Sequence, residues 1–131
     1  LRPGGSDAVI LTIGPVADYA LEAAERARKE LGLDVAVYDM IYLKPIDATI
    51  LEQVAATGAP VITVEDGTVD GGLGSAVLEW FASAGVSLPV TRLGVPDRFI
   101  PHGKPAELHR LCGFDAEGIF NAIRNLKTPL R

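Results

Sequence analysis

The chain has 131 residues, 48% of them hydrophobic, and a formal net charge of −5. This length and apolar fraction predict one globular domain with its own core and exclude a disordered chain, while the negative charge disfavours nucleic acid and anionic membranes as partners. No uncharged apolar stretch approaches the roughly 20 residues that a membrane span requires. The single cysteine, Cys112, has no partner for an internal disulfide, so we expect a cytoplasmic location.

The chain opens at Leu1, and its only methionine is Met40. We therefore expect part of a longer protein, with a processed natural N-terminus as the alternative. Residues 1–7 are interpreted as a residual linker, because they are polar and rich in glycine. The rest of the chain shows no internal repeat and no second domain.

The first part of the chain predicts a strand, a helix and a second strand. Residues 8–13 form a short apolar run, typical of a strand buried on both faces. Gly14-Pro15 stops this strand and begins a helix that Gly32 ends. Residues 33–38 alternate more strongly, which indicates a strand at the edge of the sheet. The apolar stripe of the helix consists of Val16, Ala20, Ala24, Ala27 and Leu31, and its charged face is interpreted as solvated.

The middle of the chain predicts a helix and then a strand, a glycine-rich turn and another helix. Asp47 is expected to cap the first helix, which Gly58 ends. Residues 60–85 begin with an apolar strand at 61–64, and Gly85 has the left-handed position that terminates a helix. The spacing of five residues puts them on one face of that helix: Leu73, Val77, Trp80, Phe81 and Ala84.

The last part predicts a fourth strand and two helices. Residues 89–93 form the strand, and the proline- and glycine-rich residues 94–103 should be irregular. A short helix is expected over 105–113. Asp115 then caps a final helix. The apolar face of this helix consists of Ile119, Ile123 and Leu126.

This alternation of strands and helices predicts a three-layer α/β/α fold with a mainly parallel sheet. Right-handed crossovers make 2-1-3-4 the expected strand order. Ligands of such sheets bind beyond the carboxyl ends of the strands, where the winding reverses. That point lies here between Gly14-Pro15 and the acidic glycine loop of residues 65–74.

The acidic glycine loop has three interpretations. Residues 72–77, GLGSAV, nearly match a G-x-G-x-x-G phosphate cradle, but valine replaces the third glycine. No lysine or arginine lies within residues 45–91, and Glu65, Asp66 and Asp70 would repel a pyrophosphate. We favour a second interpretation, in which the glycines permit tight or left-handed turns and close packing, while the carboxylates cap the helix or bind a partner's backbone N–H groups. In the third, the loop is one edge of a composite site completed by another domain; a metal held by this chain alone is not expected.

Few other residues suggest chemistry. His102 and Asp97 lie on the irregular loop after the fourth strand, at the carboxyl edge of the sheet. A histidine that only caps backbone groups is an equal alternative. No spacing of Ser, His, Asp or Cys indicates a nucleophile, so no catalytic, cofactor-binding or metal-binding residue is predicted.

Four stretches occur in the same order in one enzyme family: residues 38–47, 64–79, 93–103 and 113–119. On these stretches the chain resembles the C-terminal domain of the 1-deoxy-D-xylulose-5-phosphate synthases over nearly its whole length. The run PDRFI is the most specific part, and it distinguishes this family from transketolases and the β subunits of 2-oxoacid dehydrogenases. The chain departs from the family at Ile41, where arginine is usual.

The resemblance implies the third, C-terminal domain of a large homodimeric enzyme. That enzyme condenses pyruvate with D-glyceraldehyde 3-phosphate and releases CO2, using thiamine diphosphate and Mg²⁺, and its product feeds isoprenoid, thiamine and pyridoxal synthesis. In the family the cofactor lies between the two preceding domains. The resemblance therefore implies that this domain alone is inactive and binds no cofactor.

We therefore expect a structural and assembly domain whose partners are the two preceding domains and a second copy of the enzyme. The alternatives are the C-terminal domain of another transketolase-like or 2-oxoacid dehydrogenase β enzyme, and an independent flavodoxin-like ligand-binding module. The residues expected at an interface or at the edge of the active site are Glu65, Asp66, Gly71, Gly72, Gly74, Ser75, Asp97 and His102.

Overall fold

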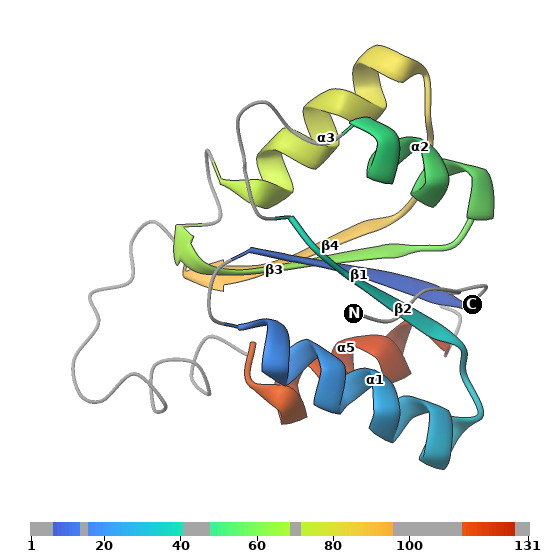
Figure 1. Ribbon diagram of the computed structural model, residues 1–131, viewed down its shortest axis with the longest axis vertical. Coiled ribbons are helices and arrows are strands. Elements are labelled where there is room, and N and C mark those ends of the chain that lie inside the picture. The colour runs from blue at the N-terminus through green and yellow to red at the C-terminus, as the bar shows by residue number, and fades with distance from the viewer. Residues whose placement is uncertain (1–6, 14–15, 41–47, 69–71, 96–113, 128–131) are drawn as a thin grey trace.

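A four-stranded parallel sheet with the order β2-β1-β3-β4 lies between two layers of helices (Figure 1). The computed structural model describes residues 7–13, 16–40, 48–68, 72–95 and 114–127. The strands are β1 (Ala8–Ile13), β2 (Val35–Asp39), β3 (Val61–Thr68) and β4 (Val90–Val95). The helices are α1 (Ala17–Leu31), α2 (Ala48–Thr57), α3 (Leu73–Ala84) and α5 (Ala116–Lys127).

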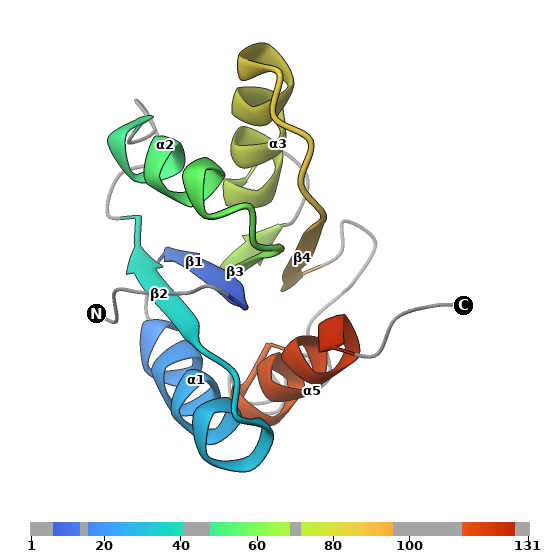
Figure 2. The same cartoon turned by 90° about the vertical axis from the view of Figure 1, so that its right-hand side faces the viewer.

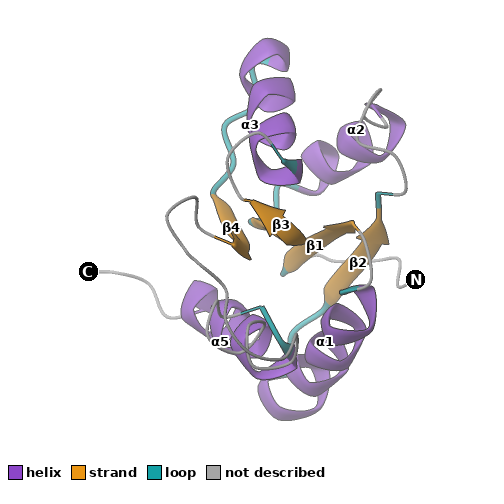
Figure 3. Cartoon of the chain, turned by 90° about the vertical axis from the view of Figure 1, so that its left-hand side faces the viewer, coloured by secondary structure: helices purple, strands orange, loops and turns teal. Residues whose placement is uncertain are grey.

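The predicted fold class and strand order are confirmed. Helices α2 and α3 cover one face of the sheet, and α1 and α5 cover the other (Figures 2 and 3). Strand β1 pairs with both β2 and β3, so the winding reverses at β1. The strand with the most alternating sequence, β2, lies at an edge of the sheet as predicted.

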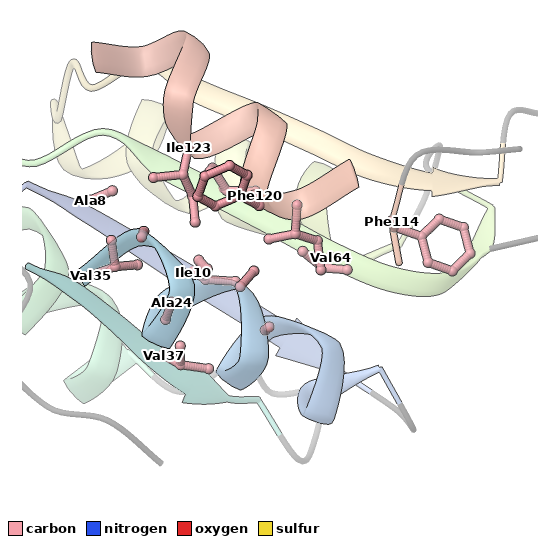
Figure 4. Packing of buried hydrophobic residues seen from close by; sticks show 14 of the residues in the cluster. Ala8, Ile10, Ala24, Val35, Val37, Val64, Phe114, Phe120 and Ile123 are labelled. Atoms are coloured by element: carbon pink, nitrogen blue, oxygen red, sulfur yellow. The ribbon is translucent and has the colours of Figure 1, made fainter. Parts of the chain in front are cut away.

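The sheet has a hydrophobic core on each face, because its central strands point alternate side chains into the two layers. Ile10, Val37 and Val64 face α1 and α5, where they meet Phe120 and Ile123 (Figure 4). The alternate residues form the core under α2 and α3: Val9, Leu11 and Val61. Both faces of β1 are therefore fully covered, as its continuous apolar run predicts.

Three helix ends follow the predicted chemistry, whereas α1 begins at Ala17, with Val16 at its N-cap, rather than at Pro15. Gly32 and Gly85 end α1 and α3 in the left-handed conformation, with φ of 67° and 73°. The backbone N–H of Gly118 donates to Oδ1 of Asp115 at 2.9 Å, which caps α5. Asp47 and the helix expected over residues 105–113 lie outside the described residues.

Two expectations about the central unit are corrected. Strand β3 runs to Thr68 rather than ending near Val64, because it continues to pair with β4 past an irregularity between Val64 and Thr68. Ala84 is exposed, since the last turn of α3 extends beyond the sheet, whereas Leu73, Val77 and Phe81 are buried as predicted. Trp80 is half-buried and meets the Phe81 ring edge-on, with centroids 5.9 Å apart.

The exposed face of α1 carries ion pairs that join it to α5. Arg26 bonds Glu30, at 2.7 Å, and Glu117 of α5, and its guanidinium lies 3.9 Å from the centre of the Phe120 ring. The hydrogen bonds that Arg26 donates to these two carboxylates, first of all to Glu117, raise the pKa of Arg26 above its ordinary value. Among the described residues, no helix has the length and apolar character needed to cross a membrane.

Candidate functional site at the start of helix α3

The switch point of the sheet places the start of α3 beside the carboxyl end of β3. Ile13, the last residue of β1, pairs with Glu65 of β3. Side-chain alternation along β3 puts Thr63 and Glu65 on the same face as Val61, which is the face covered by α2 and α3. Both polar side chains are consequently directed under the helix that follows the acidic glycine loop.

Glu65 is a buried carboxylate that caps α3. It is 5% exposed, and its two oxygens accept hydrogen bonds from the backbone N–H groups of Leu73 and Gly74, at 3.0 and 3.2 Å. The first N–H groups of a helix lack partners within the helix and attract negative charge. Glu65 therefore satisfies two of these groups at the N-terminus of α3, where Gly72 has no side chain to do so.

Gly74 allows α3 to lie close to the sheet. A Cβ atom at this position would lie 2.6 Å from Cγ and Cδ of Arg92 and 2.9 Å from Oγ1 of Thr63. Both distances are too short for any real Cβ, and the Thr63 side chain is fully buried. Gly74 is therefore required by packing against β3 and β4, which is the close approach that the sequence predicts.

Gly72 does not adopt the left-handed conformation that was one expectation for the glycines of this loop. Its φ is −98° and its ψ is −150°, an extended conformation that does not require glycine. Its carbonyl oxygen accepts a hydrogen bond from the N–H of Ala76 at 3.1 Å and so begins the helix. Among the described residues, positive φ occurs only at Gly32, Gly58 and Gly85.

The irregular pairing of β3 with β4 lies beside this cap. Val64 pairs with Leu93, whereas Thr68 pairs with Val95, so β3 has extra residues over this interval. Such bulges bend a strand and redirect its side chains, and they are frequent beside functional sites. Glu65 comes directly after the last regular pair, where the strand departs from its partner.

The structure brings some of the predicted site residues together. Glu65, Gly72, Gly74 and the half-buried Ser75 gather at the first turn of α3. Asp66 belongs to β3, and nothing is described of its side chain. Outside the described residues lie Gly14, Pro15, Gly71, Asp97 and His102.

Two neighbours of this site were not predicted. Thr63 lies two residues before Glu65, and Arg92 lies two residues after Val90, so strand alternation alone places both side chains on the α3 face. Strand alternation does not give the register of β4 against β3. This register pairs Thr63 with Arg92 and so brings both to the site. This register explains why the stem of an exposed arginine reaches Gly74.

The geometry of this site does not fit a phosphate group or a metal ion. The N–H groups that would bind a phosphate already donate to the negative carboxylate of Glu65. Within the described part of the chain, no group of three or more His, Cys, Asp and Glu side chains is arranged to hold a metal. The described residues of this site therefore form a structural junction between β3 and α3.

These features define a class of protein. The chain belongs to the transketolase C-terminal domain family, whose family model, described as "Transketolase, C-terminal domain", matches residues 1–119. It is 43% identical over 123 residues to the 1-deoxy-D-xylulose-5-phosphate synthase of Bacteroides fragilis, covering 94% of this chain and 19% of that protein. It is also 47% identical to the synthase of Cytophaga hutchinsonii, covering 93% of this chain and 19% of the relative.

The chain thus spans about a fifth of the length of these curated relatives. The resemblance predicted from the sequence, to the C-terminal domain of the synthases, is confirmed.

Solved structures agree with this assignment. A chain described as "Split gene transketolase, inactive beta4 tetramer" superposes with a TM-score of 0.85 at 37% identity, covering 98% of this chain and 41% of that one. The transketolase of Campylobacter jejuni gives a TM-score of 0.63 at 18% identity, covering 95% of this chain and 18% of the other. At that identity the second structure supports the fold alone.

Proposed function

We propose that the chain is the third, C-terminal domain of a 1-deoxy-D-xylulose-5-phosphate synthase and serves its structure and assembly. The complete enzyme would condense pyruvate with D-glyceraldehyde 3-phosphate to give 1-deoxy-D-xylulose 5-phosphate and CO2. The supporting observation is 43–47% identity to synthases over more than nine-tenths of this chain. The short share of each relative supports a domain within a longer chain.

The proposal assigns the chemistry to the rest of the enzyme. Thiamine diphosphate would supply the carbanion that attacks the acceptor aldehyde, and Mg²⁺ would hold its diphosphate. The described residues of this domain do not fit either group, because Glu65 occupies the N–H groups at the α3 N-terminus. We therefore derive no catalytic step for the residues of this chain.

The proposed partners are the two preceding domains of the same polypeptide and a second copy of the enzyme, in the cytoplasm. Glu65 and Gly74 serve packing inside the domain, because both oxygens of Glu65 accept N–H groups of α3 and Gly74 packs against β3 and β4. The proposal keeps Asp66, Gly71, Gly72, Ser75, Asp97 and His102 as candidates for this interface or for the edge of the active site.

The test compares the complete gene product with the 131-residue chain. With thiamine diphosphate and Mg²⁺, the complete protein should release CO2 from pyruvate in a reaction that depends on glyceraldehyde 3-phosphate. The 131-residue chain should fold, as judged by circular dichroism, and show no turnover. Turnover by this chain would contradict an assembly role. A complete protein without the activity would contradict the synthase assignment.

Calorimetry distinguishes the independent ligand-binding module. Glu65 already accepts the N–H groups at the start of α3 that a nucleotide phosphate would need. Titration of the 131-residue chain with NAD, FMN or ATP, with and without Mg²⁺, should therefore give no binding. A micromolar dissociation constant for any of them would favour the flavodoxin-like alternative.

A further inference from the structure

The two helical layers differ in the charge of the residues that they expose to water. Every exposed residue of α1 is charged: Asp18, Glu22, Arg28, Lys29 and Glu30. Arg28 and Lys29 pair with Glu25, which adds a network of opposite charges to this surface. A helix face of alternating charge with i, i+3 and i, i+4 pairs is typical of a surface that remains in solvent.

The other layer has almost no charge. Glu52 is the only charged residue of α2, and Glu79 is the only one of α3. Leu78 is 40% exposed and is the only large hydrophobic side chain exposed among the described residues. The remaining exposed positions of the two helices are small or neutral, among them Thr49, Gln53, Ala56, Ala82 and Ser83. We call the exposed residues of these two helices the neutral face.

The packing of the domain itself does not explain the neutral face. The inner sides of α2 and α3 already bury Leu51, Val54, Val77 and Phe81 against the sheet. The exposed residues point away from that core, so a charged side chain there would cost the isolated domain almost nothing. Depletion of charge is instead the compositional mark of the centre of a protein interface, because a charge desolvated there without a partner is destabilising.

The length of the relatives indicates which partner covers the neutral face. This domain is 19% of the B. fragilis synthase and 41% of the split-gene transketolase chain, so most of each polypeptide lies outside it. We propose that the neutral face of α2 and α3 docks on the preceding part of the same polypeptide, while the charged face of α1 remains in water. This proposal rests on the proposed function, in which the chain is one domain of a longer enzyme.

The chemistry of the occupant is constrained. Its surface should be apolar and uncharged where it meets Leu78 and Ala82, which lie one turn apart on α3. It should offer a cation or N–H donors to Glu52 and Glu79, the two acidic groups of the neutral face.

The test introduces single lysines into the complete gene product, two on the neutral face and one on the opposite layer. Ala82→Lys and Ala56→Lys introduce a charge at exposed positions of α3 and α2, and Asn125→Lys does the same at an exposed position of α5. All three are expected to leave the circular dichroism and melting of the 131-residue chain nearly unchanged, because surface substitutions cost little.

In the complete protein, hydrogen exchange of the α3 backbone amides reports docking. Ala82→Lys and Ala56→Lys should speed this exchange at least about tenfold relative to the wild type, because an unpaired desolvated charge weakens an interface by that much or more. Asn125→Lys should not change it. Equal exchange in all variants would overturn the proposal.

A second copy is the competing occupant. If sedimentation shows that the 131-residue chain self-associates, that Ala82→Lys makes it monomeric, and that exchange in the complete protein is unaffected, the face belongs to a second copy and the proposal fails. Synthase activity of the wild-type complete protein tests the proposed function separately. An active enzyme whose Ala82→Lys and Ala56→Lys variants both behave like Asn125→Lys would contradict only the docking proposal.

Discussion

The carboxylate of Glu65 accepts a hydrogen bond at 3.0 Å from the backbone N–H of Leu73, eight residues farther along the chain. Together with the bond from Gly74, this contact joins the end of a central strand to the first turn of the next helix. The loop between them is thereby closed by a buried side chain rather than by the backbone alone. The stability of the domain should depend on this single group.

Glu65→Ala removes the acceptor of two buried N–H groups and should lower the free energy of unfolding by about 2–4 kcal/mol. Glu65→Gln keeps one acceptor oxygen and should cost about half as much. Urea unfolding of the 131-residue chain measures both. Glu79→Ala, at an exposed position of the same helix, should stay within about 0.5 kcal/mol of the wild type. Equal losses for Glu65→Ala and Glu79→Ala would mean that the cap contributes little.

Gly74→Ala should destabilise the domain by about 1–3 kcal/mol, because the added methyl group overlaps Arg92 and Thr63. The stem of Arg92 is exposed and can move, whereas Thr63 is buried. Gly74→Ala combined with Arg92→Ala should therefore be less destabilising than the sum of the two single changes. Strict additivity in chemical denaturation would show that Arg92 does not restrict position 74.

Thr12→Val should stabilise the domain by about 1 kcal/mol, since Oγ1 of Thr12 is buried and has no hydrogen-bond partner among the described residues. Valine has nearly the same shape and suits a strand. Val37→Thr, which puts a hydroxyl into the core under α1, is the opposite control and should be destabilising. Thermal melting compares them, and a lower Tm for Thr12→Val would indicate that the hydroxyl is satisfied.

In the homodimer proposed above, Gly72→Val should weaken dimerisation of the complete protein more than it destabilises the 131-residue chain. The extended backbone of Gly72 does not require glycine, so we expect the new side chain to act mainly on whatever approaches the loop. We expect at least about tenfold weaker dimerisation by sedimentation. If the 131-residue chain unfolds while the complete protein stays dimeric, the glycines serve only the internal turn.

Hydrophobic periodicity was sufficient to predict the sheet. The continuous run of β1 and the alternation of β2 specified a central and an edge strand, and glycine marked the ends of α1 and α3. The predicted end of β3 was wrong. Acidic residues and a glycine normally indicate a turn, whereas here they continue a bulged strand. Local pattern does not report pairing with a strand farther along the chain.

For the same reason, the site was predicted only in part. Capping of a helix by acidic residues was one of two uses foreseen for the carboxylates, and Glu65 shows it. The close packing of Gly74 was also foreseen, but its neighbours were not, because Thr63 and Arg92 meet only through the register of β4. The composition of an exposed face, by contrast, depends on contacts outside the domain, which the sequence of the domain alone does not describe.

Helix α5 is the last described element of the chain, yet it lies beside α1 on the same face of the sheet (Figure 2). Its Ile119, Phe120 and Ile123 complete the core around Ile10 and Val64. During synthesis on a ribosome, this face therefore stays open to water until α5 has emerged, although β1 and α1 are made far earlier.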